Sequence, residues 1–215
     1  MSAAPARAAL LLTPGAGAGR DQPSLVAIEE AVGPAGVIVE RMDFPYRLAG
    51  RKAPDRPPVL LAAVCAGAAR LAAEAGVAPQ RVALGGRSMG GRMCSQAVAE
   101  GLPCLGLVLV SYPLHPPGRP ENRRDGHFPD LAVPCLFVSG TRDAFATPAE
   151  LESATAAIPG PVTHVWLDGG DHGLRRRDAA VADAVAAWLI PLSRDDWPLR
   201  PASSSKPGAG PRPRG

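Results

Sequence analysis

Aromatic residues, cysteines and long hydrophobic runs are all scarce in this chain, and each scarcity excludes a class of protein. Aromatic residues make up only 4% of the 215 positions, so the core must be built from alanine, valine and leucine. The four cysteines, Cys65, Cys94, Cys104 and Cys135, lie in apolar runs, and no two of them form a C-x-x-C pair. This pattern argues against a disulfide framework or a zinc site and predicts buried, reduced thiols.

No apolar run approaches the length of a transmembrane span, so we expect no membrane partner. The first residues, "MSAAPARAALLLTPGAGA", mimic a secretory signal, but their apolar run "AALLL" is shorter than the hydrophobic region of such signals. We therefore interpret this run as the first strand of the fold and expect a cytoplasmic protein.

Most of the chain also lacks an excess of charge of either sign. The formal net charge is +3, but Arg200, Lys206, Arg212 and Arg214 lie in the last sixteen positions, where no acid occurs. Without these four residues the net charge is −1, so nothing indicates a nucleic-acid partner. Residues 195–215 are rich in proline, serine and glycine, which predicts a disordered basic tail after one domain at 1–194.

Short apolar runs recur along the chain, and helical patterns separate them. The runs cover 8–12, 36–40, 81–85, 106–111, 134–139 and 163–168. The helical patterns cover 23–32, 58–76, 147–158 and 175–192, and a further one follows Ser88. The runs are nearly continuous in apolar residues, as expected of strands that are covered on both faces. The alternation predicts an α/β fold, a parallel sheet with helices on both faces.

A glycine-rich motif surrounds Ser88. Gly86-Arg87-Ser88-Met89-Gly90 fits the pattern G-x-S-x-G, with a predicted strand directly before it and a predicted helix directly after it. That context is typical of a nucleophile elbow, a sharp turn that presents the serine hydroxyl above the edge of the sheet. We expect no room for a Cβ atom at positions 86 and 90, because strand and helix approach closely there.

Two further residues complete a candidate catalytic triad in the order Ser, acid, His. Asp143 follows the fifth predicted strand in "SGTRDAF", and His172 follows the sixth in "DGGDHGL". Active sites of open α/β sheets lie at these carboxyl ends of the strands. Ser88 would be the nucleophile, His172 the general base and then acid, and Asp143 the residue that orients the imidazole. Asp171 is the alternative to Asp143.

An oxyanion hole needs two backbone donors. One is expected from the N–H of Met89, the residue after the nucleophile. The other is expected from the loop "TPGAGAGRDQP", for which Ala16 is the first choice, with Gly15 and Gly17 as alternatives that would also contact substrate. Phe44 and Tyr46, in "MDFPY", are candidate walls of a substrate pocket, although core packing explains them equally well.

A dinucleotide-binding loop was the competing interpretation of the same glycines. Gly15, Gly17 and Gly19 follow the first strand, and Glu40 lies where a ribose-binding acid would be expected. The pattern G-x-G-x-x-G, however, would place its third glycine at Arg20.

His115 and His127 match no metal-ligand spacing, so we expect a solvated loop there. His164 lies within a predicted strand and is interpreted as structural.

Taken together, these stretches resemble the α/β-hydrolase superfamily, in particular its small, lid-poor, dienelactone-hydrolase-like branch. The resemblance extends to hydrolase-like subunits of a chromatin acetyltransferase complex. It rests on "LLLTPGAGAGRDQP", "ERMDFPYRLAGRKAPDRPP", "VALGGRSMGGRMCS", "SYPLHPPGRPE", "FVSGTRDAF" and "GGDHGL", which span residues 10–173. It implies a sheet of six to seven strands without a separate lid, and it supports the three triad positions. Pro14 departs from the family, since relatives often carry histidine there.

These features predict a serine hydrolase that cleaves a small-molecule ester or related acyl bond through an acyl-enzyme at Ser88. No metal and no organic cofactor are expected. We expect the strand order 2-1-3-4-5-6. The alternative is an interaction protein that retains a hydrolase scaffold and binds partners through loop 115–127 and the basic tail. A reductase is the third class considered.

Overall fold

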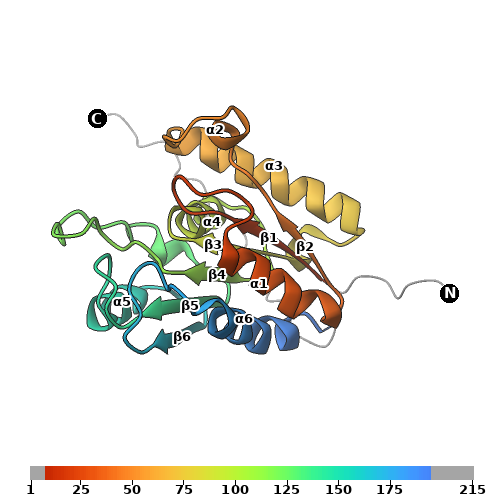
Figure 1. The fold of residues 1–215 in the computed structure, drawn as a ribbon. Helices are drawn as coiled ribbons and strands as arrows, with labels where there is room; N and C mark the ends of the chain where they lie inside the picture. The colour runs from red at the N-terminus through yellow and green to blue at the C-terminus, as the bar shows by residue number, and fades with distance from the viewer. Residues whose placement is uncertain (1–7, 195–215) are drawn as a thin grey trace, which may run out of the picture.

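The computed structural model describes residues 8–194, in which six strands alternate with helices (Figure 1). The strands are β1 (Ala8–Thr13), β2 (Val37–Arg41), β3 (Val82–Arg87), β4 (Leu107–Val110), β5 (Cys135–Gly140) and β6 (Val162–Leu167). The helices are α1 (Pro23–Val32), α2 (Pro45–Leu48), α3 (Pro57–Ala75), α4 (Met89–Ala99), α5 (Pro148–Thr155) and α6 (Asp178–Leu192). The tail predicted to be disordered, 195–215, lies outside the described residues.

The six strands form one parallel sheet with the order β2-β1-β3-β4-β5-β6. This confirms the predicted α/β class and the predicted strand order. After β1, the chain forms β2 on one side of β1 and then crosses over to form β3 on the other side. In open α/β sheets such a switch point is where a ligand crevice forms, at the carboxyl ends of the strands.

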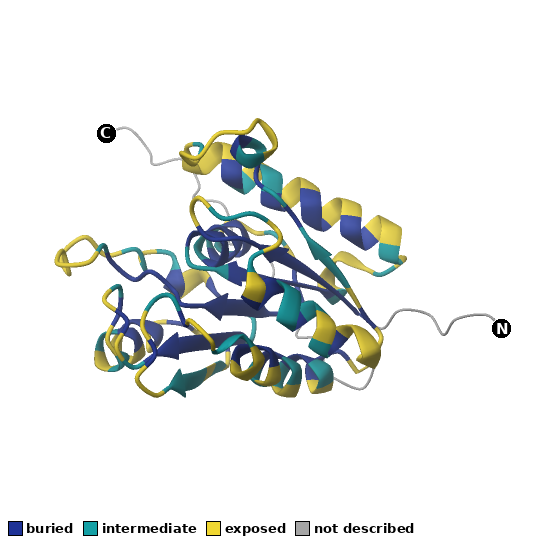
Figure 2. Cartoon of the chain, in the orientation of Figure 1, coloured by how far each residue is buried: buried dark blue, intermediate teal, exposed yellow. Residues whose placement is uncertain are grey.

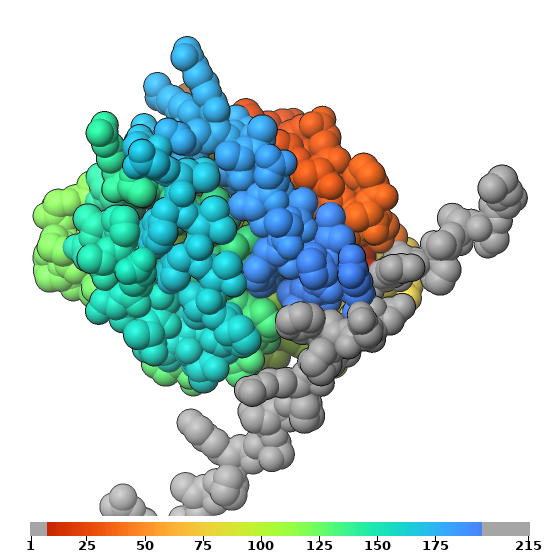
Figure 3. Space-filling view, turned by 90° about the horizontal axis from the view of Figure 1, so that it is seen from below, coloured from red at the N-terminus to blue at the C-terminus, as the bar shows by residue number. Residues whose placement is uncertain are grey.

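Helices cover both faces of the sheet, and alternate residues of the central strands supply two cores. Leu11 of β1 belongs to the core under α3, α4 and α5, whereas Leu10 and Leu12 belong to the core under α1 and α6. Figure 2 shows the central strands as the most buried layer, whereas the edge strands β2 and β6 are partly exposed. Figure 3 shows α6 lying beside α1 on the face seen from below. No separate lid domain is present among residues 8–194.

Proline and capping residues set several helix ends where the sequence predicted them. α1 begins at Pro23, and α5 begins after Thr147, whose hydroxyl accepts a hydrogen bond from the Glu150 N–H. The Glu150 carboxylate accepts the Thr147 N–H at 2.8 Å, which completes the predicted capping box. The four-residue helix α2 was not predicted, because one helical turn carries no periodic pattern.

Helix α3 corrects two expectations from the sequence. It is long and apolar enough, with a mean hydropathy of 1.5, to pass for a membrane span by length and composition, although no such stretch was expected. In the structure its buried stripe, which includes Leu60, Val64 and Leu71, packs against the sheet. Cys65 is exposed on this helix, whereas the other three cysteines are buried as predicted.

Candidate active site

Ser88 lies in the sharp turn between β3 and α4 and caps the N-terminus of α4. Its backbone has φ 51° and ψ −116°, a conformation that L-residues rarely adopt. Two hydrogen bonds hold the turn: the Ser88 N–H donates to the Val110 carbonyl at 2.8 Å, and the Arg92 N–H donates to the Ser88 carbonyl at 3.1 Å. The turn therefore ties the serine to the neighbouring strand on one side and to the helix on the other.

The two flanking glycines are required by close backbone packing, as the sequence predicted. A Cβ atom at Gly86 would lie 2.2 Å from the Thr13 carbonyl oxygen, and one at Gly90 would lie 2.5 Å from the same oxygen. The obstacle is thus the end of β1, rather than strand β3 pressing on helix α4. The missing side chains allow the turn to sit directly against β1 and its following loop, where the oxyanion hole was expected.

Asp143 and His172 come from two loops that lie against each other. The Arg142 N–H donates to the Gly170 carbonyl at 2.8 Å, which joins the loop after β5 to the loop after β6. Asp143 is only 3% exposed, and its Oδ1 accepts the Phe145 N–H at 2.8 Å. Burial and this hydrogen bond fix the carboxylate in one orientation.

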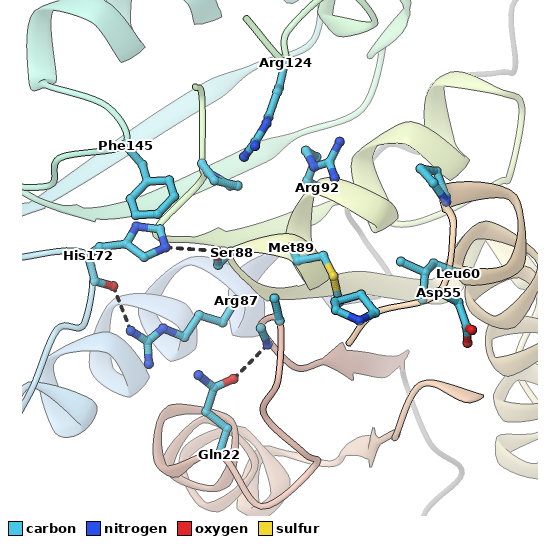
Figure 4. A pocket seen from close by; sticks show the side chains of 15 residues that line it. Gln22, Asp55, Leu60, Arg87, Ser88, Met89, Arg92, Arg124, Phe145 and His172 are labelled. Carbon is cyan, nitrogen blue, oxygen red and sulfur yellow. Dashed lines mark hydrogen bonds between the residues drawn. The ribbon is translucent and has the colours of Figure 1, made fainter. Parts of the chain in front are cut away.

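One continuous chain of hydrogen bonds links the three predicted side chains. His172 Nε2 lies 2.9 Å from Ser88 Oγ, and His172 Nδ1 lies 2.8 Å from Asp143 Oδ2 and 3.0 Å from Oδ1 (Figure 4). The imidazole is stacked on the Phe145 ring, with centroids 3.9 Å apart. Asp171, the alternative acid, is exposed and does not contact the imidazole.

Arg87 holds the loop that carries His172. Its Nη2 donates to the His172 carbonyl at 2.7 Å, so the residue directly before the nucleophile holds the backbone of the base (Figure 4). Burial lowers the pKa of Arg87 from its ordinary value, and the carboxylates of Asp178, Asp171 and Asp143 partly offset that effect.

The loop after β1 leaves one N–H free beside the serine. The Gly15 N–H donates to the Gln22 side chain at 3.0 Å, and the Gly17 N–H donates to the Tyr46 hydroxyl at 3.1 Å. Within residues 8–194 the Ala16 N–H has no acceptor, and the Met89 N–H at the start of α4 has none either. Ala16 and Met89 line the same cavity as Ser88.

A cavity of about 550 Å³ opens at this edge of the sheet, and Ser88 and His172 are part of its wall. The rest of the wall comes from the loop after β1, the segment before α3 and the start of α3, the end of β3, the start of α4, and the segments after β4 and β5. These residues are Gly15, Ala16, Gln22, Pro54, Asp55, Pro57, Leu60, Arg87, Met89, Arg92, Pro113, Arg124 and Phe145. Such a volume suits a small-molecule substrate.

Phe44 and Tyr46 do not line this cavity, which corrects the prediction that they contact substrate. Both are fully buried in the core under α3, and their rings stack with centroids 6.4 Å apart. Gly17 is also absent from the cavity wall, whereas Gly15 is part of it. Tyr46 instead acts on the site indirectly, through its hydrogen bond to the Gly17 N–H.

Several residues that line the cavity were not predicted from the sequence, among them Gln22, Arg92 and Arg124. Gln22 precedes the proline that starts α1, and Arg92 lies one helical turn after Ser88 on α4. The i,i+4 spacing of Ser88 and Arg92 is a signal that could have identified Arg92. Arg124 lies in a long irregular segment, where no periodicity indicates which side chains point inward.

The remaining histidines are not part of a solvated loop. His115 is buried and lies 3.4 Å from Glu150, and His127 Nε2 lies 2.8 Å from the Ser95 hydroxyl. His164 packs between aromatic rings as a structural residue. The longest exposed stretch of this connection is its tip, 117–123, because hydrogen bonds anchor the segments on either side of it. Within residues 8–194, no group of three or more metal-ligating side chains is placed to hold a metal ion.

A parallel sheet with this order, a serine at a strand–turn–helix elbow and an acid and histidine after later strands define the class of α/β hydrolases. The chain belongs to the alpha/beta hydrolase domain family, whose sequence model matches residues 6–188. Glu40, the candidate ribose ligand of the dinucleotide interpretation, forms an ion pair with Arg70 instead.

Solved structures of the same fold are similar over most of the chain. Est1E from Butyrivibrio proteoclasticus is 16% identical, with a TM-score of 0.70 over 86% of this chain and 88% of that one. A dienelactone hydrolase from Anabaena variabilis is 20% identical, with a TM-score of 0.67 over 86% of each chain. A monoacylglycerol lipase from Paleococcus ferrophilus is 15% identical, with a TM-score of 0.70 over 87% of this chain and 96% of that one.

Proposed function

We propose that this protein is a serine hydrolase that cleaves a small carboxylic ester or related acyl bond. The observation that carries the proposal is the uninterrupted hydrogen-bond chain from Ser88 Oγ through His172 to Asp143, at distances of 2.9 and 2.8 Å. A serine hydroxyl becomes nucleophilic only when a positioned base removes its proton. Membership of the hydrolase family supports the proposal, and so do the names of two structural neighbours, a dienelactone hydrolase and a lipase.

In the first half-reaction, Ser88 Oγ attacks the carbonyl carbon of the ester while its proton moves to His172 Nε2. Asp143 accepts the Nδ1–H and stabilises the imidazolium that forms. The Ala16 and Met89 N–H groups donate to the developing oxyanion, at the N-terminus of α4. The intermediate collapses when the alcohol leaves with the proton from Nε2, and an acyl-enzyme on Ser88 remains.

In the second half-reaction, water attacks the acyl carbon while His172 Nε2 takes one of its protons. The same two N–H groups bind the second oxyanion. Collapse of this intermediate releases the carboxylic acid and returns the proton to Ser88 Oγ. The proposal needs neither a metal ion nor an organic cofactor, because every proton has a donor and an acceptor among these residues.

The test combines turnover of 4-nitrophenyl acetate with covalent labelling by a fluorophosphonate. We expect wild-type protein to hydrolyse the ester and to be labelled at Ser88, and Ser88→Ala to do neither. Asp143→Asn should lower kcat by roughly 10³- to 10⁴-fold, because the imidazole loses the acceptor that fixes its tautomer. Asp171→Asn, which alters the neighbouring exposed acid, is the matched control and should stay near wild type. A wild-type protein that neither turns over nor labels would instead favour an interaction protein on a hydrolase scaffold.

A further inference from the structure

Two arginines reach the cavity beside Ser88 without any acidic partner. Arg92 and Arg124 both line the cavity and are half-buried, and within residues 8–194 neither side chain forms a hydrogen bond or an ion pair. The Nε atom of Arg92 is buried and has no partner at all. In Figure 4 the two side chains lie together on one side of Ser88, opposite Gln22.

The backbones that carry these arginines are well anchored, although Arg124 belongs to a long connection. Arg92 lies in the first turns of α4, where its N–H donates to the Ser88 carbonyl. The Arg124 N–H donates to the Leu114 carbonyl at 2.8 Å, and its carbonyl accepts the Tyr112 hydroxyl at 2.7 Å. The backbones of both arginines are therefore held at fixed places near the nucleophile, and both residues line the cavity.

Two acidic side chains near the cavity are each bound by another arginine. Asp125, next to Arg124 in the chain, is bound by Arg123 at 2.5 Å. Asp55, the carboxylate in the cavity wall, is bound through Oδ1 by Arg51 at 2.6 Å, while its Oδ2 is buried without a partner; in Figure 4 it lies beyond Met89, away from Arg124. The two free guanidinium groups are thus the uncompensated charges on their side of the cavity.

Two like charges that are close together and partly withdrawn from water are unfavourable without an anion. Burial and the charge of Arg124 both lower the pKa of Arg92. A protein retains such an arrangement only where something offsets its desolvation, and arginine is the side chain best suited to bind a carboxylate with two parallel hydrogen bonds.

We propose that Arg92 and Arg124 bind a carboxylate on the substrate, so that this hydrolase acts on esters whose acyl part carries a second, free carboxylate. The inference rests on the proposed function, since it places that carboxylate in the same cavity as the scissile ester. The carboxylate would contact the two guanidinium groups while the ester carbonyl lies between Ser88 Oγ and the Ala16 and Met89 N–H groups. The two arginines are specificity residues and take no part in proton transfer.

The test compares two esters that differ only in one charge: the mono-4-nitrophenyl ester of adipic acid and the methyl ester of that compound. We expect kcat/KM to be about tenfold or more higher for the acid, since hydrogen bonds to charged groups contribute that much. Arg92→Gln and Arg124→Gln should each reduce this preference by about tenfold. Arg119→Gln, at the exposed tip of the connection and outside the cavity, is the matched control and should retain the preference.

A binding measurement separates failure of this inference from failure of the proposed catalysis. Calorimetric titration of Ser88→Ala with monomethyl adipate should show binding that dimethyl adipate lacks and that Arg92→Gln in the same background abolishes. Hydrolysis of both esters at equal kcat/KM, with Ser88 still labelled, would overturn the carboxylate site and leave the hydrolase intact. Absence of both turnover and labelling would overturn the hydrolase, and the titration would then decide the carboxylate site alone.

Discussion

At the scale of single residues, the Tyr46 hydroxyl is predicted to position the oxyanion loop. It accepts the Gly17 N–H at 3.1 Å, next to the free N–H of Ala16, and the tyrosine itself is fully buried. Tyr46→Phe keeps the ring but leaves the Gly17 N–H without its acceptor, so the loop loses one of the hydrogen bonds that anchor it. We expect kcat for 4-nitrophenyl acetate to fall roughly tenfold, with little change in KM, because the donor acts mainly on the transition state.

The control for this substitution is Thr155→Val, which removes a buried hydroxyl from α5 that does not line the cavity. That hydroxyl lies 2.9 Å from His164, so its loss should also destabilise the fold. If both variants lower the melting temperature but only Tyr46→Phe lowers kcat, the hydroxyl is a positioning group. Equal effects on kcat would assign Tyr46 to the core alone.

Ser88 itself is predicted to store backbone strain. Its φ of 51° with ψ of −116° lies in a region that glycine adopts freely and other residues do not. Ser88→Gly should therefore relieve strain that Ser88→Ala retains. We expect Ser88→Gly to exceed Ser88→Ala in free energy of unfolding by about 1 kcal/mol, after allowance for the greater flexibility of glycine in the unfolded chain. Urea unfolding of the two inactive variants measures the difference, and an alanine variant of equal or greater stability would argue against strain.

At the scale of elements, His127 joins the connection between β4 and β5 to helix α4. Its Nε2 lies 2.8 Å from the Ser95 hydroxyl, and burial, with the charge of Arg92, lowers the pKa of His127 to about 4. Asp125 and Asp130 oppose that shift only partly. In the unfolded chain the histidine titrates near its ordinary value of about 6.5. Between these values the unfolded state binds a proton that the folded state excludes, so stability falls as pH decreases.

The corresponding prediction concerns the variant His127→Gln, which can still hydrogen-bond to Ser95 but does not titrate. We expect the melting temperature of the wild type to drop more steeply than that of the variant from pH about 6.5 to about 4, and the two curves to be parallel above that window. Differential scanning fluorimetry across this range measures both slopes. The difference between the proteins isolates His127, because His164, whose pKa burial also lowers, is common to both. Parallel curves throughout would contradict the prediction.

The element scale also shows which features the sequence could predict. All six strands were predictable from short apolar runs, which mark burial on both faces in β1, β3, β4 and β5, although the edge strands β2 and β6 are partly exposed. Ser88, Asp143 and His172 could be placed near one another because each follows a strand, and parallel strands share one carboxyl edge. Arg124 could not be found because it lies in an irregular segment without periodicity. The short helix α2 could not be found because a single helical turn shows no periodic pattern. Phe44 and Tyr46 were assigned to the pocket because an aromatic residue after a strand fits a core and a pocket equally well.

At the scale of the whole molecule, the distribution of charge decides how an anionic substrate would be recognised. The formal net charge of +3 becomes −1 without the four basic residues of the last sixteen positions. A nearly neutral body produces little long-range attraction for an anion, so the preference proposed for carboxylate-bearing esters must come from contact with Arg92 and Arg124. Contacts in a partly buried cavity are screened by salt much less than attraction between exposed charges.

A preference that depends on contact with two arginines should respond only weakly to salt. Raising the ionic strength from about 0.01 M to about 0.15 M shortens the Debye length from about 30 Å to about 8 Å. We expect the ratio of kcat/KM for the adipate mono-ester to that for its methyl ester to fall by less than about threefold over this range, because local hydrogen bonds survive screening. Steady-state kinetics with both esters at each ionic strength measure the ratio. A fall of about tenfold or more would show that the general field of the protein, rather than the two arginines, attracts the anion.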